Sequence, residues 1–292
     1  MRNNSRIILL DVGGTFIKSA LGIPEVGAVE GTFQCTPISS DGTAEQIQEA
    51  FRQAVVGQMK DAAESGCQIE AVCSVIPGPF DYTEGRFLMK HKFAAVYGRT
   101  LRDILGDVSG DEIRLAFAHD VNGALRGALE ADQSLKCGTI ALSTLGTGLG
   151  FAYAIDGQVQ ASPTGSPAVS IWNAPYMDGI LEDYVSRRAI LRFYAELGGK
   201  LDEGDDVKEI ADRAREGDEN ALETFRLIGR HYASGVGHVI SSLNITRLLF
   251  AGQISKSFDL MEKEIINGLG EGVQVNVLDD IQGTVLKGLV SM

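Results

Sequence analysis

The sequence lacks the features of a membrane protein or of a secreted, disulfide-linked protein. No run of about 18 apolar residues occurs, so no transmembrane helix is predicted. The apolar stretch Ile7–Leu10 stops at Asp11, which is too short for the core of a signal peptide. The four cysteines are scattered without a CxxC pair, which argues against a cysteine-based zinc site. We therefore expect a cytoplasmic protein with reduced thiols, no membrane partner and no zinc site.

Basic residues are also scarce relative to acidic ones. The chain has 26 Lys and Arg against 39 Asp and Glu, a formal net charge of −13, which argues against a nucleic-acid partner. Hydrophobic residues make up 44% and charged residues 22% of the sequence, so intrinsic disorder is excluded. A length of 292 residues favours two domains.

Glycine, in contrast, is abundant, with 35 residues in a chain of 292. Many of them lie in two segments that read as strand, glycine turn, strand: Arg6–Gly22 and Gly138–Val159. The turns themselves are Asp11-Val12-Gly13-Gly14-Thr15 and Leu145-Gly146-Thr147-Gly148. Such an internal duplication predicts two α/β lobes that face each other across a cleft.

The glycine turns point to phosphate binding. A turn without side chains lets backbone N–H groups approach an anion closely. Neither turn fits the P-loop or the dinucleotide fingerprint, and a single glycine hairpin is usually structural. Asp11, however, ends a buried strand, where a carboxylate is costly unless it is paired or bound to a metal. A Mg²⁺ ion held by Asp11 through water, beside phosphates, would remove that cost, so the two turns together predict a nucleotide cleft.

The remaining elements are read from hydrophobic periodicity and breakers. We expect strands at Ile69–Ile76, Arg114–Ala118 and Thr246–Phe250, and helices at Thr43–Ser65 (with a capping box from Thr43 to Gln46), Val121–Ala131, Asp178–Leu197, Asp205–Glu216 and Asp218–Leu243. The domain boundary is predicted near Ala118. The N-terminal lobe is then 1–118, completed by the C-terminal helix 280–292, and the larger C-terminal lobe is 119–279.

Six segments, in order along the whole chain, carry a family resemblance. Asp11-Val12-Gly13-Gly14-Thr15-Phe16-Ile17-Lys18 resembles the first phosphate motif of the ROK family (repressors, open reading frames, kinases), which belongs to the actin-like, hexokinase and Hsp70 superfamily. The other five segments are Pro77-Gly78-Pro79-Phe80-Asp81 with Gly85 (PGPxD), His119-Asp120-Val121-Asn122 (the catalytic segment), Leu145–Gly150 (the second phosphate motif), Leu181–Ser186 (LExxxS) and Ala251-Gly252-Gln253 (the adenosine-contacting glycines).

The resemblance implies a fold and an activity. The fold is α/β, with two actin-like ATPase lobes of the ribonuclease H-like kind, and the activity is that of a glucokinase-like sugar kinase of carbohydrate metabolism. It would use ATP and Mg²⁺ and phosphorylate a hydroxyl of a small sugar. Family members are commonly homodimers, so a homodimer is expected here.

The resemblance also assigns roles to residues. Asp120 is the candidate general base, because phosphoryl transfer to an alcohol needs a carboxylate within reach of the hydroxyl; its alternative role is to cap the helix that follows. The cofactor-binding residues are Asp11 (for Mg²⁺), Gly13, Gly14, Thr15, Lys18, Gly146, Thr147, Gly148 and Gly252. Lys18 is equally well explained as a solvated strand residue, and Gly252 as a turn glycine.

The expected substrate-binding residues are Pro77, Gly78, Lys92, His119, Asp120 and Glu182. Glu182 is the best candidate for accepting a sugar hydroxyl, and its alternative is an exposed carboxylate on a helix face. Trp172 and Tyr176 could line the sugar site or belong to the core. His231 and His238 lie on one side of a helix and are more often packing or surface residues than metal ligands.

The sequence departs from the family pattern in three places. The usual zinc segment, with its cysteine cluster and preceding E-x-G-H, is missing, and Ala168–Tyr176 has neither Glu nor His. His119 stands where the family has Asn, and Lys90-His91-Lys92-Phe93 stands where the family carries an Asn for the sugar. The added positive charge suggests a substrate with an anionic group or a large substituent. Alternatively, the lysines are exposed and His119 contacts a hydroxyl.

Three other functions are considered. A DNA-binding repressor of the family would carry a helix-turn-helix domain ahead of Asp11, and the negative charge speaks against it. A second alternative is a ROK protein that binds sugar or nucleotide without catalysis. A third is a sugar kinase that uses another phosphate donor, such as polyphosphate, because the Ala251-Gly252-Gln253 signal is thin.

Overall fold

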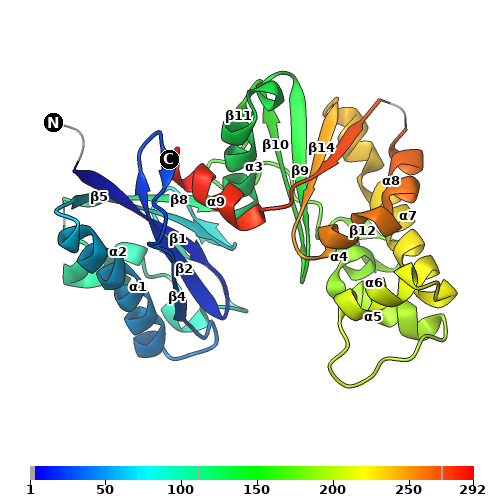
Figure 1. Ribbon diagram of the computed structural model, residues 1–292, viewed down its shortest axis with the longest axis horizontal. Coiled ribbons are helices and arrows are strands. Elements are labelled where there is room, and N and C mark those ends of the chain that lie inside the picture. Colours follow the sequence, from blue (N-terminus) through cyan, green and yellow to red (C-terminus); the bar gives the residue numbers. More distant parts are fainter. Residues whose placement is uncertain (1–3, 111, 271) are drawn as a thin grey trace. The chain divides into compact units, whose positions relative to one another are not determined.

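The structure is a computed structural model that describes residues 4–110, 112–270 and 272–292, and the chain divides into two compact units (Figure 1). Unit 1 runs to Ser134 and also includes Ala161–Pro167 and Gln282–Met292, whereas unit 2 contains Leu135–Gln160 and Ala168–Ile281. The division after Ser134 differs from the predicted boundary at residue 118, because the helix that begins at Asp120 packs on the sheet of unit 1.

Unit 1 is built on a mixed sheet in the order β3-β2-β1-β5-β8, with β4 also paired to β2. β1, β5 and β8 are parallel, and β1 and β2 form an antiparallel hairpin. The strands are β1 (Ser5–Val12), β2 (Phe16–Ile23), β3 (Gly27–Ala28), β4 (Gln34–Pro37), β5 (Gln68–Ile76) and β8 (Arg114–His119), with a separate small hairpin of β6 (Phe80–Asp81) and β7 (Arg86–Phe87). β1, β5 and β8 all end at the same edge of the sheet.

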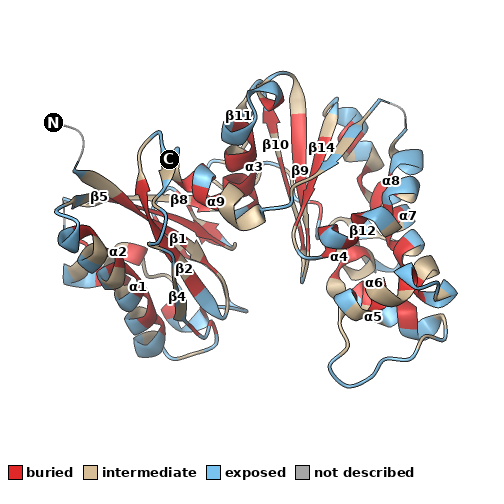
Figure 2. Ribbon diagram, viewed as in Figure 1, coloured by how far each residue is buried: buried red, intermediate tan, exposed pale blue. Residues whose placement is uncertain are grey.

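One face of this sheet is covered by α1 (Ala44–Glu64). The predicted helix is confirmed, including the capping box between Thr43 and Gln46. Its apolar side, with Ile47 and Phe51, is fully buried against the sheet, while the outward side is exposed (Figure 2). Unit 1 also contains α2 (Leu101–Leu105) and the short 3₁₀ helices η1 (Ala94–Val96) and η2 (Gly106–Val108).

The other face is covered by α3 (Asp120–Ala131), on which α9 (Ile281–Val290) packs at very short range. A Cβ atom on Gly127 would lie 1.7 Å from the carbonyl oxygen of Thr284, and one on Gly288 would lie 2.0 Å from that of Gly123. The backbones of the two helices therefore touch, and only glycine fits at these two positions.

Unit 2 is built on the sheet β11-β10-β9-β14-β15. β9 and β10 form the second antiparallel hairpin, and β9, β14 and β15 are parallel. The strands are β9 (Thr139–Leu145), β10 (Leu149–Ile155), β11 (Gln158–Val159), β14 (Arg247–Ala251) and β15 (Gln274–Val277).

The core of unit 2 forms between this sheet and the long helix α7 (Glu219–Ser242). Phe225 and Tyr232 of α7 are fully buried, and the Tyr232 ring packs against Phe250 of β14 with centroids 5.0 Å apart. Figure 2 shows the buried strands of this sheet beside helices whose outer sides are exposed. The other helices of unit 2 are α4 (Glu182–Val185), α5 (Arg187–Glu196), α6 (Val207–Arg215), η4 (Ile254–Leu260) and α8 (Glu262–Leu269), and η3 (Gln133–Lys136) lies at the junction of the units.

The predicted helix Asp178–Leu197 is wrong in its first half. Residues 175–180 form a small hairpin of β12 (Pro175–Tyr176) and β13 (Gly179–Ile180), and Ser186 has an extended backbone (φ −98°, ψ 174°) that separates α4 from α5. The hairpin turn is stabilised locally, because Ile180 N–H donates to the Asp183 carboxylate. The other predicted helices and strands are present within one or two residues of the expected bounds. None of the helices in the described part of the chain has the length and apolar character needed to span a membrane.

Candidate functional site

The first glycine turn closes the β1–β2 hairpin, in which Asp11 pairs with Lys18. Within the turn, Gly13 N–H donates to the carbonyl of Phe16, and the loop after β4 satisfies the turn carbonyls: Ser40 N–H donates to Gly14 and Ile38 N–H to Thr15. Among the described residues, no hydrogen bond is formed by the N–H groups of Gly14 and Thr15. The turn is thus held through its carbonyls and leaves two adjacent donors for an anion.

Three of the predicted segments meet at one edge of the unit 1 sheet. Asp11 lies at the end of β1, Pro77 and Gly78 follow β5, and His119 ends β8 with Asp120 directly after it. The register places Asp11 beside Val75 and Ile76 beside His119, so these ends are neighbours. A Cβ atom on Gly78 would lie 3.4 Å from Nε2 of His119, which shows how closely this turn approaches the ring.

Asp120 stands at the first position of α3, and its side chain is 54% exposed. Its Oδ1 lies 2.6 Å from Nδ1 of His119 and accepts the N–H of Val121 at 2.7 Å. His119, not Asp120, occupies the N-cap position. Partial desolvation by the surrounding protein would raise the pKa of this half-exposed carboxyl, but the His119 ring, the Val121 N–H and Lys92 together hold it below its usual value. The carboxylate is therefore ionised at neutral pH.

The pKa of Asp11 is shifted in the opposite direction, above its usual value. Burial raises the pKa of its carboxyl, Lys18 at 3.8 Å partly offsets this, and the Asp120 carboxylate raises it further. A carboxylate whose charge is disfavoured by burial and by a neighbouring carboxylate fits a divalent cation. Among the described residues, no group of three or more His, Cys, Asp or Glu could hold a metal ion. The donor set therefore fits Mg²⁺ bound by a carboxylate, water and phosphates rather than a metal enclosed by protein ligands.

The remaining predicted residues of unit 1 lie near the same edge. Lys92 is exposed on the loop before Phe93 and lies close enough to Asp120 to lower the pKa of that carboxyl. Lys18 is partly exposed and pairs with Asp11 across the hairpin. Unit 1 therefore contains one cluster of interacting charged side chains, formed by Asp11, Lys18, Lys92 and Asp120.

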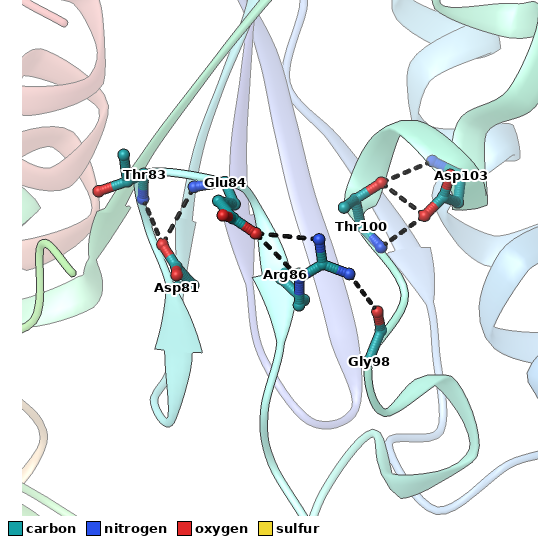
Figure 3. Close-up of polar contacts among 7 residues, drawn as sticks. All are labelled: Asp81, Thr83, Glu84, Arg86, Gly98, Thr100 and Asp103. Carbon is teal, nitrogen blue, oxygen red and sulfur yellow. Dashed lines mark hydrogen bonds and ion pairs between the residues drawn. The ribbon is translucent and has the colours of Figure 1, made fainter.

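The residues of the PGPxD segment mainly stabilise a local turn of the backbone. Oδ1 of Asp81 accepts the N–H groups of Thr83 and Glu84, at 2.9 and 3.0 Å, and Gly85 closes the turn at a φ of +71° (Figure 3). Next along the chain, Arg86 contacts Glu84 and the carbonyl of Gly98, and Thr100 and Asp103 cap α2. The conformation of Gly85 would strain any other residue, and a Cβ there would lie 2.4 Å from the Phe117 ring.

The second glycine turn, in unit 2, is built like the first. It closes the β9–β10 hairpin, and Gly146 N–H donates to the carbonyl of Gly148. The Gly146 carbonyl accepts the N–H of Arg187 at 2.9 Å. In the described part of the chain, the N–H groups of Thr147 and Gly148 make no hydrogen bond, and a Cβ on Gly146 would meet open space.

Gly252 lies against this second turn. It follows β14 with a φ of +102°, and a Cβ atom there would lie 2.4 Å from the carbonyl oxygen of Leu145, the last residue of β9. Glycine is therefore required by the close approach of two backbones as well as by conformation. The structure brings Gly252 and the Gly146–Gly148 turn together, as a shared nucleotide site would require.

The side chain of Glu182, the first residue of α4, contacts the same turn. Its side chain is only 19% exposed, and its Oε2 accepts the N–H of Leu149 at 2.9 Å. A Cβ on Gly148 would lie 2.7 Å from Oε2, and Nη2 of Arg188 lies 3.5 Å from Oε1. Glu182 is thus not an exposed helix-face carboxylate. Arg187 pairs with Asp206, whereas Arg188 is 67% exposed.

Tyr176, at the end of the segment where the zinc motif is missing, belongs to an aromatic cluster. The Tyr176 hydroxyl lies 3.0 Å from Nδ1 of His231, and the His231 ring stacks on Phe193 at 5.4 Å and tilts against Tyr184 at 5.0 Å. Burial lowers the pKa of His231, and Arg230 and Arg192 add to this effect. The donor set of this cluster does not fit zinc, because it offers one imidazole and no thiolate. His238 is exposed, and Trp172 is half-exposed beside the hairpin.

Three residues to which the sequence assigned no role lie near the predicted site residues of unit 1. Tyr82 donates to the carbonyl of Ile76 and packs on His119 with centroids 5.8 Å apart. Asn122 is buried, donates to Gly165, and leaves its Oδ1 unpartnered among the described residues. Ser40 supports the first turn. Asn122 was visible in the His119–Asn122 segment, whereas nothing in the sequence marks Tyr82 or Ser40.

Comparison with known proteins decides the family. A sequence model of the ROK family matches residues 7–168 and 176–280, which is most of the chain. The chain belongs to the ROK family. The unmatched residues 169–175 fall in the segment where the zinc motif is absent. A search of the curated proteins found no match.

Solved structures of other ROK members are similar over almost the whole chain. A ROK glucokinase from Streptomyces griseus, in complex with glucose and AMPPNP, has a TM-score of 0.77 at 21% identity, covering 97% of this chain and 98% of its own. A ROK transcriptional regulator, a homologue of the E. coli MLC protein, has a TM-score of 0.81 at 16% identity, covering 99% and 78%. A polyphosphate/ATP-glucomannokinase from Arthrobacter has a TM-score of 0.68 at 20% identity, covering 98% and 97%. The α/β fold of the actin-like class is thereby confirmed.

Proposed function

We propose that this ROK protein transfers the γ-phosphoryl group of ATP to a sugar hydroxyl, with Asp120 as the general base. The observation that carries the proposal is the arrangement around Asp120: an ionised, half-exposed carboxylate at a helix start, 2.6 Å from an imidazole nitrogen. A carboxylate with these properties can accept the proton of a sugar hydroxyl as its oxygen attacks phosphorus. The new P–O bond forms to the sugar while the bond to the β-phosphate oxygen of ADP breaks.

The two glycine turns support phosphate binding by the backbone. Each turn has two carbonyls that accept hydrogen bonds from the protein, and each presents two N–H groups without a protein partner among the described residues: Gly14 with Thr15 in unit 1, and Thr147 with Gly148 in unit 2. Lys18 and the Thr15 hydroxyl add further donors to the first turn. Gly252, packed on the second turn, is proposed to lie beside the nucleoside.

Asp11 is the proposed site of Mg²⁺. The ion, when bound, would neutralise charge on the phosphates and on the two neighbouring carboxylates. Asp11 itself contributes a carboxylate at the end of a strand, kept close to its lysine partner.

The substrate is proposed to be a sugar that carries an anionic group or a substituent larger than a plain hexose. Lys92 adds positive charge close to the proposed base, and the His119 ring lies 2.6 Å from it. In unit 2, Arg188 contacts Glu182 and also lines a pocket of about 290 Å³ together with Asp183, Tyr184 and Arg192. Glu182 of unit 2 is proposed to accept a sugar hydroxyl through Oε1.

Two other candidates have specific support. The similarity to a ROK transcriptional regulator favours, as an alternative, a member that binds sugar without transferring phosphate. The similarity to a polyphosphate/ATP-glucomannokinase favours a second phosphate donor. Retention of Asp11, both turns and Asp120 supports catalysis over simple binding.

One experiment separates these candidates. Purified protein is incubated with Mg-ATP or Mg-polyphosphate and a panel of neutral, amino, acidic and glycosidic sugars, and phosphosugar is detected by ³¹P NMR. Sugar-dependent product with ATP supports the proposal, and product only with polyphosphate changes the donor. Melting-temperature shifts with sugars but no product with either donor would favour the binding protein. Equal use of glucose and of acidic or glycosidic sugars would refute the proposed substrate class.

A further inference from the structure

Glu182 is attached to the second glycine turn at the point where the hairpin closes. Its Oε2 accepts the N–H of Leu149 at 2.9 Å. Leu149 is the first residue of β10 and lies opposite Leu145, the last residue of β9. The carboxylate therefore satisfies the backbone donor that directly follows the turn.

The absence of a side chain at Gly148 leaves room for this contact. A Cβ atom at this position would lie 2.7 Å from Oε2 and 3.5 Å from Cδ of Glu182. Any larger residue would push the carboxylate away from the Leu149 N–H. Gly148 is thus explained by the approach of Glu182, whereas Gly146 has open space around its Cβ position.

The start of α5 holds the other end of the same turn. Arg187 N–H donates to the carbonyl of Gly146 at 2.9 Å. Glu182 itself is fixed by its own N–H, which donates to the carbonyl of Trp172, and by Arg188 at Oε1. The α4–α5 segment therefore grips the turn on both sides, at Gly146 and at Leu149. Between these points lie the two N–H groups, of Thr147 and Gly148, that form no hydrogen bond within the described residues.

We infer that Glu182 is a positioning residue for the second glycine turn, which it holds in the conformation that receives phosphate. This role rests on the proposed function and deepens it. The same carboxylate would serve the turn through Oε2 and a sugar hydroxyl through Oε1, so sugar and nucleotide binding are coupled through one side chain. Leu149 is buried, so its N–H group needs an acceptor, and the Glu182 side chain fixes the turn by supplying one.

The test uses Glu182→Ala, Glu182→Gln and, as the control, Glu196→Ala, each in the whole 292-residue chain. Affinity for Mg-AMPPNP is measured by calorimetry without sugar. Glu182→Ala, which removes the acceptor, is expected to weaken nucleotide binding about tenfold or more. Glu182→Gln keeps an acceptor for Leu149 and is expected to retain nucleotide affinity while its KM for sugar rises. Glu196→Ala removes an exposed carboxylate at the end of α5 that contacts neither Glu182 nor the turn, and this variant should bind nucleotide like the wild type.

A second readout needs no ligand. Exchange of the Leu149 amide hydrogen, followed by NMR, is expected to be slow in the wild type and in Glu182→Gln and at least about tenfold faster in Glu182→Ala, since only that variant loses the acceptor. The amide of Leu249 in β14 serves as the control for overall stability. Unchanged exchange at Leu149 in Glu182→Ala, or unchanged nucleotide affinity with only the sugar KM raised, would overturn the inference. Wild-type protein that binds no nucleotide would instead refute ATP as donor, and the exchange measurement would still decide the role of Glu182.

Discussion

Nδ1 of His119 lies 2.6 Å from Oδ1 of Asp120, and the two residues occupy the N-cap and first positions of α3. The His119 ring helps to keep the proposed base ionised, although partial desolvation alone would raise the pKa of the Asp120 carboxyl. This contact also explains how His119, where the family has Asn, remains compatible with a base at the next position.

The first prediction concerns pH. The pKa of Asp120 lies below its ordinary value of 3.8, so the wild type should lose no activity through protonation of this base between pH 8 and pH 5. His119→Phe removes the partner that lowers the pKa, so the carboxyl protonates at higher pH. The fall of kcat/KM on the acidic side of the profile should then occur at a higher pH than in the wild type. Profiles between pH 4 and pH 8, with Tm recorded at each pH, measure this, and identical limbs in both proteins would contradict it.

The second prediction concerns Asp11. Because its pKa is raised in the folded protein, the folded state holds the proton more tightly than the unfolded one, and the carboxylate form destabilises the fold as pH rises above 3.8. Asp11→Asn should therefore raise Tm at pH 7 while lowering turnover at least about a hundredfold. Asp41→Asn, at an exposed position, is the control and should change neither. A lower Tm for Asp11→Asn would show that the ionised carboxylate does not destabilise the folded state.

The third prediction concerns the contact between α3 and α9. Gly127→Ala and Gly288→Ala would each place a methyl group within 2.0 Å of a backbone oxygen, so the helices must separate. Each should lower the free energy of unfolding by at least about 2 kcal/mol. Gly237→Ala in α7 is the matched control, because no atom lies within 4 Å of its Cβ position, and alanine there should be neutral or stabilising. Urea unfolding of the three variants distinguishes these outcomes.

The fourth prediction concerns the segment without a zinc motif. The Tyr176–His231–Phe193 cluster holds the β12–β13 hairpin to α7 and α5, and no thiolate is present for zinc. A zinc chelator should therefore leave Tm unchanged. His231→Ala should reduce stability by about 1–3 kcal/mol, since it removes three ring contacts and leaves the Tyr176 hydroxyl without its partner. His238→Ala, at an exposed position on the same helix, should have no effect. One equivalent of bound zinc, with a lower Tm after its removal, would refute this explanation.

Much of the fold could be predicted because the signals are local. The capping box of Thr43 and Gln46 and the two glycine hairpins each depend on residues that are close in the sequence, and all three are present. The break at Ser186 could not be predicted in this way. Helical periodicity continues across it, and the break arises because Arg187 N–H is bound to Gly146.

The candidate site was predictable only in part. Asp11, Gly78, His119 and Asp120 were placed at strand ends by sequence, and the parallel order of β1, β5 and β8 brings them to one edge. The contact of Glu182 with Leu149 joins residues 33 positions apart and has no local signal. Neither does the packing of Tyr82 on His119, because it depends on how the turn after β5 meets β8.

The most direct test of the account compares Asp120→Asn with the wild type. Phosphosugar formation with Mg-ATP is followed under saturating conditions, and affinity for Mg-AMPPNP is measured in parallel to verify that the variant is folded and binds nucleotide. The account predicts that kcat falls at least about a hundredfold while nucleotide affinity is little changed, because only the proton acceptor is lost. A variant that retained the kcat of the wild type would contradict the assignment of Asp120 as the base.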